Sequence, residues 1–304
     1  MRIVAALGGN ALLERGEKPD EDIQEHHVQQ AVTALAPLAR SEDLVVTHGN
    51  GPQVGMLALE SASDPALTRP YSLDVLGAQT QGMIGYWLVR ALRGAAPGKH
   101  AASLVSQTRV DPDDPAFAHP TKFVGPVYEE KQARDLAAER GWVVARDGEA
   151  WRRVVPSPEP LELMELPLIR QLVDSGALVV CAGGGGIPVV ADPSGALRGV
   201  EAVVDKDLTA ALLAEAVNAD ALLLLTDVDA VIDGYGTPGA RPIRRTTPAE
   251  LRARSFPVGS MGPKVEAACR FVEATGKVAA IGRLDAATAL LTGEAGTTVS
   301  DSRH

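Results

Sequence analysis

The sequence RIVAALGGNA, at residues 2–11, carries the main indication of the fold. Residues 2–7 hold one arginine among apolar residues, without polar alternation, which is typical of a strand covered on both faces. Gly8 and Gly9 follow directly. Paired glycines let backbone N–H groups approach an anion closely, although a Gly-Gly turn also serves as plain punctuation. The stretch predicts a buried strand that ends in a turn or in an anion-binding loop.

Similar apolar runs recur along the chain and alternate with segments of helical spacing. The other predicted strands are residues 43–47, 101–105, 177–182, 200–204, 220–226 and 277–281. The predicted helices are residues 20–40, 74–93, 161–174, 207–219 and 263–275. Alternation of this kind predicts a doubly wound α/β fold, in which ligands bind at the carboxyl ends of the strands.

Composition excludes several classes of protein. The 304 residues include 45% apolar and 22% charged residues and carry a net charge of −10. This balance excludes a disordered or fibrous chain, and the negative charge argues against a nucleic-acid partner. The length fits two domains, or one large α/β unit with an insertion. We expect no signal peptide before the first strand, and no apolar run reaches the roughly 18 residues of a membrane helix.

Two cysteines, Cys181 and Cys269, are too few for a disulfide framework. A reducing compartment is the better interpretation, so we expect a soluble, cytoplasmic protein. Cys181 lies in an apolar run, where a buried inert thiol is a better prediction than a nucleophile.

Residues 111–160 differ from the rest of the chain because they are rich in proline. They contain a hairpin predicted over residues 142–155, which turns at Asp147-Gly148. The pattern predicts a small inserted subdomain that could cover a site, or alternatively an ordinary long surface excursion.

Two further glycine loops follow predicted strands: THGNGPQVG at residues 47–55 and AGGGGIP at residues 182–188. Four consecutive glycines indicate either a backbone cradle for phosphate or a flexible turn. Neither a P-loop nor a GxGxxG fingerprint is present. His48 could act as a base, but a histidine held by backbone hydrogen bonds at a strand end is the better prediction, and we assign it no catalytic role.

Lys206 and Lys264 carry the most chemical information. Both are predicted at helix starts, where the helix dipole disfavours a cation, so a negative group should lie nearby. Asp205, Asp207 and Glu266 could supply part of that charge. The alternative is a transferring phosphoryl group, which needs positioning and cationic stabilisation. Asp205 would then hold the lysines in place rather than act as a base.

The segment LTDVDAV, at residues 225–231, ends a predicted strand in polar residues. This position suits a nucleotide, and Tyr235 in the next loop could pack on its base. Asp227 and Asp229 could instead be turn formers.

In combination these motifs resemble the carbamate kinases of the amino acid kinase superfamily, from the first strand to the last helix. The segments that carry the resemblance are LGGNAL at 7–12, HGNGPQVG at 48–55, QTQGMIGY at 79–86, PTK at 120–122, AGGGGIPV at 182–189, EAVVDKD at 201–207, LTDVDAV at 225–231 and GSMGPKVE at 259–266. Phe123 stands where the family pattern has proline, which leaves the geometry of the inserted subdomain in question.

The resemblance implies a fold: a three-layer αβα sandwich around a mainly parallel sheet, with a small protruding subdomain. It assigns residues 1–110 and 161–176 to an acceptor lobe, 111–160 to the protruding subdomain and 177–304 to a nucleotide lobe.

The resemblance also implies residue roles. Lys206, Lys264 and Lys122 would surround the phosphates, supported by Asp205. The carbamoyl and phosphoryl oxygens would be held by Gly8, Gly9, Asn10, Gly49, Asn50 and Gly51. The nucleotide would contact Gly184, Gly185, Thr226, Asp227, Val228, Tyr235, Met261 and Pro263. No residue is assigned as a metal ligand.

The implied reaction interconverts MgATP plus carbamate with ADP plus carbamoyl phosphate, often as the ATP-forming last step of arginine deiminase catabolism. A homodimer is implied in the same way, and the segment at residues 74–93 is either a contributor to its interface or core. Mg²⁺ is expected with the nucleotide because its phosphates need screening. The alternatives are another small-acid kinase of the superfamily, such as one acting on acetylglutamate, and a nucleotide sensor without turnover.

Overall fold

The computed structural model describes residues 1–14, 16–256 and 261–302, apart from the side chain of Asn10. The strands of the main sheet are β1 (Arg2–Leu7), β2 (Asp43–His48), β3 (Ala101–Ser103), β9 (Leu178–Val180), β12 (Ala221–Thr226), β15 (Arg245–Thr246), β16 (Val278–Arg283) and β17 (Thr297–Val299). Their spatial order is β15-β17-β16-β12-β1-β2-β9-β3, and every pair except β16–β17 is parallel. The predicted mainly parallel sheet is confirmed.

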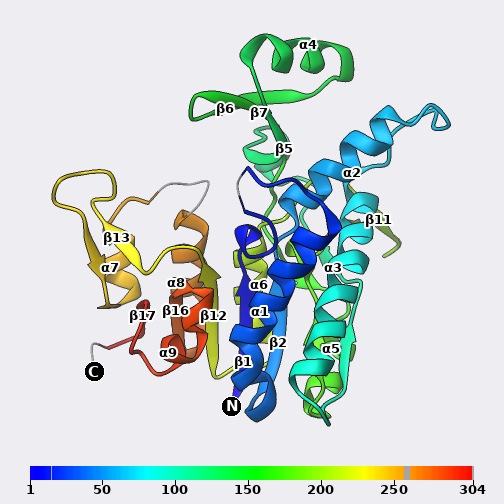
Figure 1. The fold of residues 1–304 in the computed structure, drawn as a ribbon. Helices are drawn as coiled ribbons and strands as arrows, with labels where there is room; N and C mark the ends of the chain where they lie inside the picture. Colours follow the sequence, from blue (N-terminus) through cyan, green and yellow to red (C-terminus); the bar gives the residue numbers. More distant parts are fainter. Residues whose placement is uncertain (15, 257–260, 303–304) are drawn as a thin grey trace.

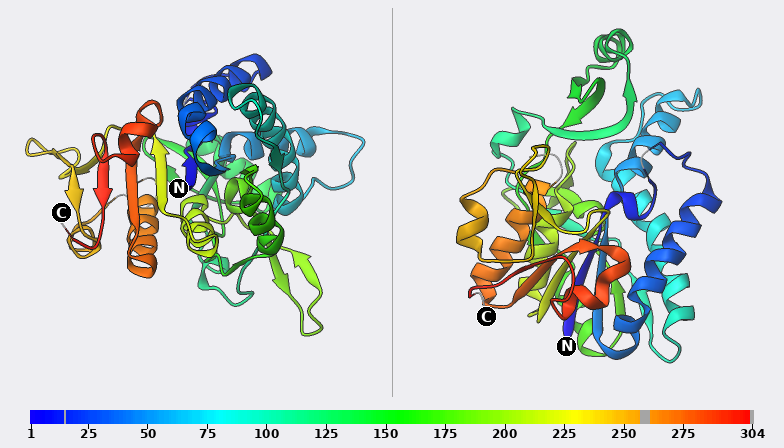
Figure 2. Two further views of the ribbon diagram at one scale, coloured as in Figure 1. Left: turned by 90° about the horizontal axis from the view of Figure 1, so that it is seen from below. Right: turned by 60° about the vertical axis from the view of Figure 1, so that its left-hand side comes forward.

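Helices cover both faces of this sheet (Figures 1 and 2). The helices are α1 (Glu21–Ser41), α2 (Gly51–Ser63), α3 (Leu73–Ala95), α4 (Glu130–Arg140), α5 (Leu166–Asp174), α6 (Lys206–Ala216), α7 (Pro248–Arg252), α8 (Met261–Thr275) and α9 (Ala287–Leu291). α5, α6 and α8 contact one face, while α1, α3 and α9 contact the other. The result is the predicted αβα sandwich.

The central strands are apolar on both sides because each side chain enters one of two cores. Val4 and Ala6 of β1 join the core under α5, α6 and α8. Ile3, Ala5 and Leu7 join the core under α1 and α3. Successive side chains of β1 point to opposite faces of the sheet, and each face is covered by an apolar core rather than by water.

The protruding subdomain rises above the carboxyl edge of the sheet (Figure 1). It consists of α4 and an antiparallel sheet of order β5-β7-β6, formed by β5 (Lys122–Tyr128), β6 (Val143–Asp147) and β7 (Ala150–Val155). We call these four elements the lid. The predicted hairpin is confirmed, but because Asp147 pairs with Ala150 its turn residues are Gly148 and Glu149.

One predicted strand is wrong. Residues 200–204 form no strand; the chain instead makes a hairpin of β10 (Ile187–Ala191) and β11 (Leu197–Gly199) just before them. β10 belongs to a second sheet with β4 (Gln107–Arg109) and β8 (Glu162–Leu163). The apolar pattern arises because Val204 packs with Val110 and Val190 in a small separate core.

The shorter elements complete the description. β13 (Val231–Asp233) and β14 (Arg241–Ile243) form an outlying hairpin, and 3₁₀ turns cover Gly9–Ala11, Pro115–Phe117, Gly183–Gly185 and Leu284–Ala286. β9 lies between β2 and β3, so the main sheet is continuous across the boundary predicted between the two lobes, and that division stays a prediction. No helix of the described residues is long and apolar enough to cross a membrane.

Candidate active site

The parallel strands β1, β2 and β12 end at the same level, which brings their following loops together. Leu7, the last residue of β1, pairs with His48 of β2 and with Leu225 of β12. The Gly8 N–H donates to the Leu225 carbonyl at 2.9 Å, and the Gly49 N–H donates to the Leu7 carbonyl at 3.0 Å. The glycine loops after β1 and β2 thus lie side by side at the edge where such sheets bind ligands.

The glycines of these loops fall into two groups. A Cβ atom on Gly8 would lie 3.0 Å from the Leu225 carbonyl oxygen, and one on Gly49 would lie 2.9 Å from Gly9 Cα. These two glycines let the loops pack together. A Cβ atom on Gly9 or Gly51 would meet no atom within 4 Å. Open space therefore lies in front of Gly9 and Gly51, where a small anion has access to the backbone.

Asn50 of the second glycine loop holds the start of α2 in place. Asn50 is buried, and its Nδ2 donates to Thr80 Oγ1 of α3 at 2.8 Å. This bond fixes the start of α2, which begins at Gly51. The N-terminal N–H groups of a helix and its dipole favour an anion. The side chain of Asn10 lies outside the described part of the chain.

The four-glycine run after β9 is a fixed, buried turn rather than a flexible one. Gly184 and Gly185 have φ values of +65° and +89°. A Cβ atom on Gly184 would collide with the Asn50 amide, and one on Gly185 with the Val204 carbonyl. The Gly185 carbonyl accepts hydrogen bonds from Thr108 and Thr209. Close packing explains the need for glycine here, and a contact of this run with nucleotide stays a prediction.

Three lysines from separate elements meet at the same edge. Lys122 begins β5 at the base of the lid, Lys206 begins α6, and Lys264 lies in the first turn of α8. Lys122 Nζ contacts Asp205 Oδ2 at 2.5 Å. Asp207 binds both other ammonium groups, Lys206 at 2.5 Å and Lys264 at 2.9 Å. Three cations face two carboxylates, so the lysine cluster has one net positive charge within an acidic protein.

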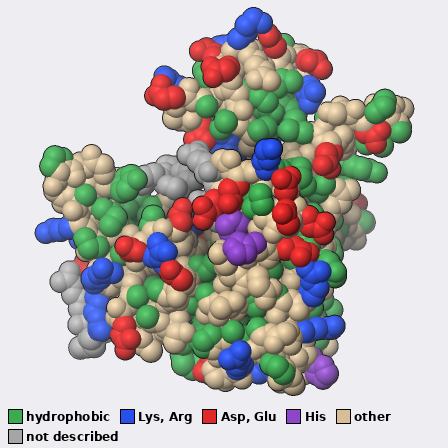
Figure 3. All heavy atoms as spheres, viewed as in Figure 1, with side chains coloured by type: hydrophobic (Ala, Val, Ile, Leu, Met, Phe, Trp, Pro, Cys, Tyr) green, Lys and Arg blue, Asp and Glu red, His purple; other side chains and the backbone are tan. Residues whose placement is uncertain are grey.

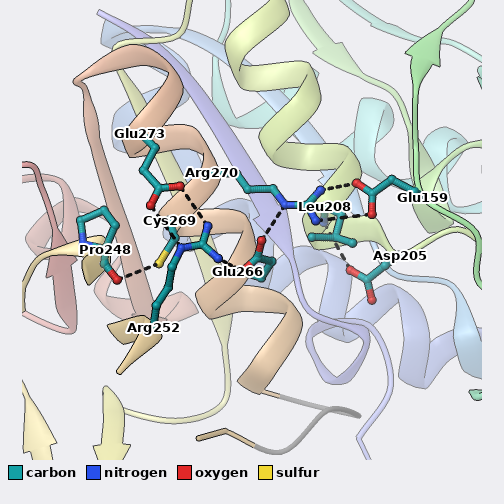
Figure 4. Close-up of polar contacts among 9 residues, drawn as sticks. All are labelled: Glu159, Asp205, Leu208, Pro248, Arg252, Glu266, Cys269, Arg270 and Glu273. Carbon is teal, nitrogen blue, oxygen red and sulfur yellow. Dashed lines mark hydrogen bonds and ion pairs between the residues drawn. The ribbon is translucent and has the colours of Figure 1, made fainter. Parts of the chain in front are cut away.

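Asp205 and Asp207 bind different lysines, whereas the sequence analysis expected Asp205 to hold them all. Asp205 Oδ1 caps α6 by accepting from the backbone N–H groups of Asp207 and Leu208; Figure 4 shows the bond from Leu208. Among the described residues, Asp205 Oδ2 pairs with Lys122, and the part of Asp205 in the reaction stays a prediction. Asp207 positions Lys206 and Lys264, because it is the residue of this pair whose side chain points between them.

Burial and charge act in opposite directions on these groups. Burial alone would raise the pKa of both aspartates, but the adjacent ammonium groups override it and hold both pKa values below the usual range. Burial lowers the pKa of Lys206 from 10.5 to about 8, although Asp207 opposes that shift. For Lys264 the attraction of Asp207 exceeds the effect of burial and raises the pKa. At neutral pH both Lys206 and Lys264 are therefore cations.

His48 is buried at the end of β2 and donates from Nδ1 to its neighbour's carbonyl, Gly49 O, at 2.9 Å. Burial, together with the smaller effect of the Lys206 charge, lowers the pKa of His48 from 6.5 to about 4, against the opposing effect of the hydrogen bond to Gly49. His48 is therefore neutral at physiological pH and poorly suited to accept a proton. The prediction of a histidine held by the backbone is confirmed.

The start of α8 differs from the prediction. Helix α8 already includes Met261 and Gly262, so Pro263 does not occupy its first position; residues 259 and 260 of the GSMGPKVE motif lie outside the described residues. Glu266 does not contact the lysine cluster but pairs with Arg252 and Arg270 (Figure 4). Arg270 also pairs with Glu159, which follows the lid in the chain (Figure 4).

Three of the predicted nucleotide residues lie at the carboxyl end of β12. Thr226 ends β12, and Asp227 and Val228 follow it; Thr226 Oγ1 donates to Asp227 Oδ1 at 3.1 Å. Tyr235 lies in the outlying hairpin with 76% of its surface exposed. The structure therefore brings Thr226 to the edge that holds the glycine loops, and it leaves the Tyr235 ring available at a distance from the packed core.

Acidic and histidine side chains gather below the lid on the face in Figure 3. A surface hollow there is lined by Glu14, Glu17, Asp22, Ile23, His26, His27 and Gln30. Glu17 accepts a hydrogen bond from the Glu14 backbone and pairs with His27 at 2.7 Å, so this segment after the first glycine loop is fixed against α1. The cationic character of the site comes from the lysine cluster, not from its surroundings.

Comparison with known proteins agrees with this geometry. The model of the amino acid kinase family matches residues 1–282. A carbamate kinase of Rhizobium meliloti (strain 1021) is 52% identical over 306 residues, covering 99% of this chain and 94% of that protein. This chain belongs to the carbamate kinases of the amino acid kinase family. The solved carbamate kinase from Giardia lamblia bound to citric acid is 40% identical with a TM-score of 0.92, and covers 99% of this chain and 98% of that chain. The same enzyme bound to AMP-PNP has a TM-score of 0.89 at equal identity and coverage.

In this carbamate kinase family member, sequence reasoning named Asp207 as one possible counter-charge but missed that it binds both Lys206 and Lys264. It also missed the helix that starts at Gly51. The Asp-Lys-Asp order at 205–207 was a usable signal, since Asp207 stands one residue after the lysine in the first turn of a helix. The start of α2 was not predicted because glycine and proline, here Gly51 and Pro52, are typical of loops. Proline is, however, also favoured in the first turn of a helix.

Proposed function

We propose that this protein catalyses reversible phosphoryl transfer between MgATP and carbamate, with ADP and carbamoyl phosphate as the other pair. The observation that carries the proposal is the lysine cluster at the carboxyl edge of the sheet, beside two glycine loops with open space before them, in a member of the carbamate kinases. Phosphoryl transfer needs little more than positioning and charge stabilisation, which is what such a site supplies.

The acceptor is proposed to bind at the loops after β1 and β2. Gly9, Gly51 and the start of α2 offer backbone N–H groups and a helix dipole to its oxygens. Gly8, Gly49 and Asn50 support them by packing and hydrogen bonding. Asn10 is assigned to this site from the sequence alone.

The chemistry requires no general base. In the ATP-forming direction, a β-phosphate oxygen of ADP attacks the phosphorus of carbamoyl phosphate, the new P–O bond forms, and the bond from phosphorus to the carbamate oxygen breaks. Carbamate leaves as a carboxylate-type anion, so no proton has to move. Lys206, Lys264 and Lys122 stabilise the charge on the transferring group. A neutral His48 and lysine-bound aspartates fit this scheme.

The nucleotide is proposed to bind over Thr226, Asp227 and Val228 at the end of β12, with Met261 and Pro263 of α8 beside it. Gly184 and Gly185 would border the phosphates through their backbone, and Tyr235 would contact the base. Thr226, Asp227 and Val228 follow β12, beside the loop after β1, whereas Gly184 and Gly185 follow β9, beside the loop after β2.

Mg²⁺ is proposed to arrive with the nucleotide. The residues that the structure describes contain no group of three or more His, Cys, Asp or Glu able to hold a metal ion, and the two site aspartates are bound to lysines. Phosphate oxygens and water would therefore supply most of its ligands, as Mg²⁺ commonly accepts. We further propose a cytoplasmic homodimer that forms ATP in arginine catabolism. Ile84 and Trp87 of α3 are core, whereas Val75 and Tyr86 of that helix are exposed and could contact a partner.

The first experiment measures ATP from ADP, Mg²⁺ and carbamoyl phosphate by luminescence. We expect ATP synthesis from carbamoyl phosphate to exceed that from acetyl phosphate by at least about tenfold, because a site that hydrogen-bonds a substrate NH₂ discriminates against an analogue that lacks it. A parallel assay in the reverse direction offers carbamate, acetate and N-acetylglutamate with MgATP.

Equal rates with N-acetylglutamate and carbamate would contradict the carbamate assignment and favour another small-acid kinase. ADP binding by calorimetry without transfer in either direction would favour a nucleotide sensor.

The lowered pKa of Lys206 predicts a pH dependence. We expect kcat/KM to fall as pH rises through about 8, because the free enzyme then loses the ammonium charge of Lys206. The decline of kcat should begin at higher pH, since bound phosphates stabilise the ammonium form. Between pH 8 and 10.5 the unfolded chain binds more protons at Lys206 than the native state does, so this group's contribution to stability rises with pH there.

The measurement is a pH–rate profile from pH 6.5 to 10 at saturating and at low ADP. A flat kcat/KM across that range would contradict a titrating Lys206.

A further inference from the structure

The lid touches α2 through two glycines that are 70 residues apart in the sequence. A Cβ atom on Gly55 would lie 2.3 Å from Gly125 Cα and 2.8 Å from Gly125 N. Real Cβ atoms do not approach backbone so closely, so any side chain at 55 must displace β5. Gly125 has a φ of +74°, a backbone conformation that favours glycine. At this point the two backbones are in direct contact.

The strand on the lid side of this contact is held firmly. Arg152 of β7 donates to the Gly125 carbonyl from Nε at 3.1 Å and from Nη2 at 2.9 Å. The same guanidinium lies over the Phe123 ring, 5.6 Å from its centroid. Val124 is buried in a small core with Val54 of α2. Strand β5 therefore cannot adjust its backbone locally without losing several contacts.

The helix on the other side carries the acceptor loop. α2 begins at Gly51, where open space faces the backbone, and Gly55 lies about one turn further along. Lys122 lies three residues before Gly125 on the same strand and reaches Asp205 at 2.5 Å. One rigid helix therefore sets the place of the acceptor loop at its start and the place of Lys122 through the glycine contact.

We propose that Gly55 and Gly125 are positioning residues that fix the Lys122 ammonium relative to the acceptor loop. The inference rests on the proposed function, because it assumes that Lys122 acts on the transferring phosphoryl group. It assigns a role in the reaction to two residues that touch no substrate: the absence of side chains at this contact sets the distance between the acceptor loop and the lysine of the lid.

The test begins with Gly55→Ala. Alanine has a higher helix propensity than glycine, so the substitution does not weaken α2 itself. Displacement of β5 moves Lys122, and misplacement by about 1 Å can reduce a rate by about 100-fold. We expect kcat for ATP formation to fall by about 10- to 100-fold, with KM for ADP within about twofold of the wild type. The matched control is Gly94→Ala in α3, whose added Cβ meets open space and which should leave kcat unchanged.

The decisive comparison repeats Gly55→Ala in a Lys122→Ala background. If Gly55 acts through Lys122, the double variant should be no slower than Lys122→Ala alone, because the lysine to be positioned is gone. Independent effects would instead multiply. A full multiplicative loss would overturn the inference and leave Gly55 with a general structural role.

Arg152→Lys provides a second variant if Gly55→Ala does not fold. It keeps the charge but loses the two-pronged contact with the Gly125 carbonyl. We expect a smaller fall in kcat, of about three- to tenfold, which again disappears in the Lys122→Ala background. Normal kcat in Gly55→Ala or in Arg152→Lys would also overturn the inference. If Lys122→Ala is as active as the wild type, the proposed role of Lys122 is wrong. If the wild type forms no ATP, the proposed function is wrong. Both results can be distinguished from a failure of the inference about Gly55 and Gly125.

Discussion

Replacing Lys206 with alanine is expected to lower kcat for ATP formation by about 100- to 1000-fold, the usual loss when one preorganised group that stabilises transition-state charge is removed. Lys206 is the site lysine that begins α6, and its charge also acts on His48 beside the glycine loop. Lys206 shares the Asp207 carboxylate with Lys264. Removing it leaves Lys264 and Lys122 to stabilise the transferring phosphoryl group from the other elements.

The measurement is the initial rate at saturating ADP and carbamoyl phosphate, with thermal unfolding recorded for the same sample. Lys131→Ala is the matched control, because Lys131 lies on the lid with 89% of its side chain exposed. Lys206→Met retains most of the side-chain volume and should lose as much activity as alanine. A folded Lys206→Ala enzyme within threefold of the wild-type kcat would contradict the role of this ammonium group.

Replacing Asp207 with alanine is expected to reduce the free energy of unfolding by about 3–5 kcal/mol, the usual cost of breaking a buried ion pair on one side. Asp207 is 4% exposed, and it is the carboxylate that binds both Lys206 and Lys264. Without it, two buried ammonium groups lose their partner and repel each other. Turnover should also fall, because both lysines lose the group that orients them.

Urea denaturation at pH 7 measures this change, and Asp135→Asn is its control. Asp135 pairs with Lys131 on the surface of the lid, and such exposed pairs contribute about 1 kcal/mol or less. A loss below about 1 kcal/mol for Asp207→Ala would indicate that the cluster does not depend on Asp207. Added ADP should increase the stability of the wild type by binding the native state.

Much of the site followed from the positions of polar residues relative to strands. The glycine loops at 8–10 and 48–51 each follow a buried strand, and the structure places them together. The lysines at 206 and 264 were found because a cation at a helix start needs an explanation. The partner of each lysine was not predictable, since it depends on which helix starts face each other across the edge of the sheet.

The strand predicted at residues 200–204 shows where local pattern fails. Val200 and Val204 pack in a minor core beside β10, and Val203 packs against the core shared by α2 and the lid. The carbonyl of Val204 lies close against Gly185. An apolar run indicates burial, but only the arrangement of the neighbouring chain determines whether burial occurs in a sheet or in an irregular segment.

Local sequence determined the order of strands and helices, the apolar character of each central strand and the residue types at the strand ends, because these depend on patterns within a few residues. Tertiary structure alone determined that Asp207 joins Lys206 to Lys264, that Asp205 joins Lys122 to α6, and that Gly55 meets Gly125. Each of these contacts joins elements distant in the chain, and its geometry depends on how close two backbones approach, which no local pattern records.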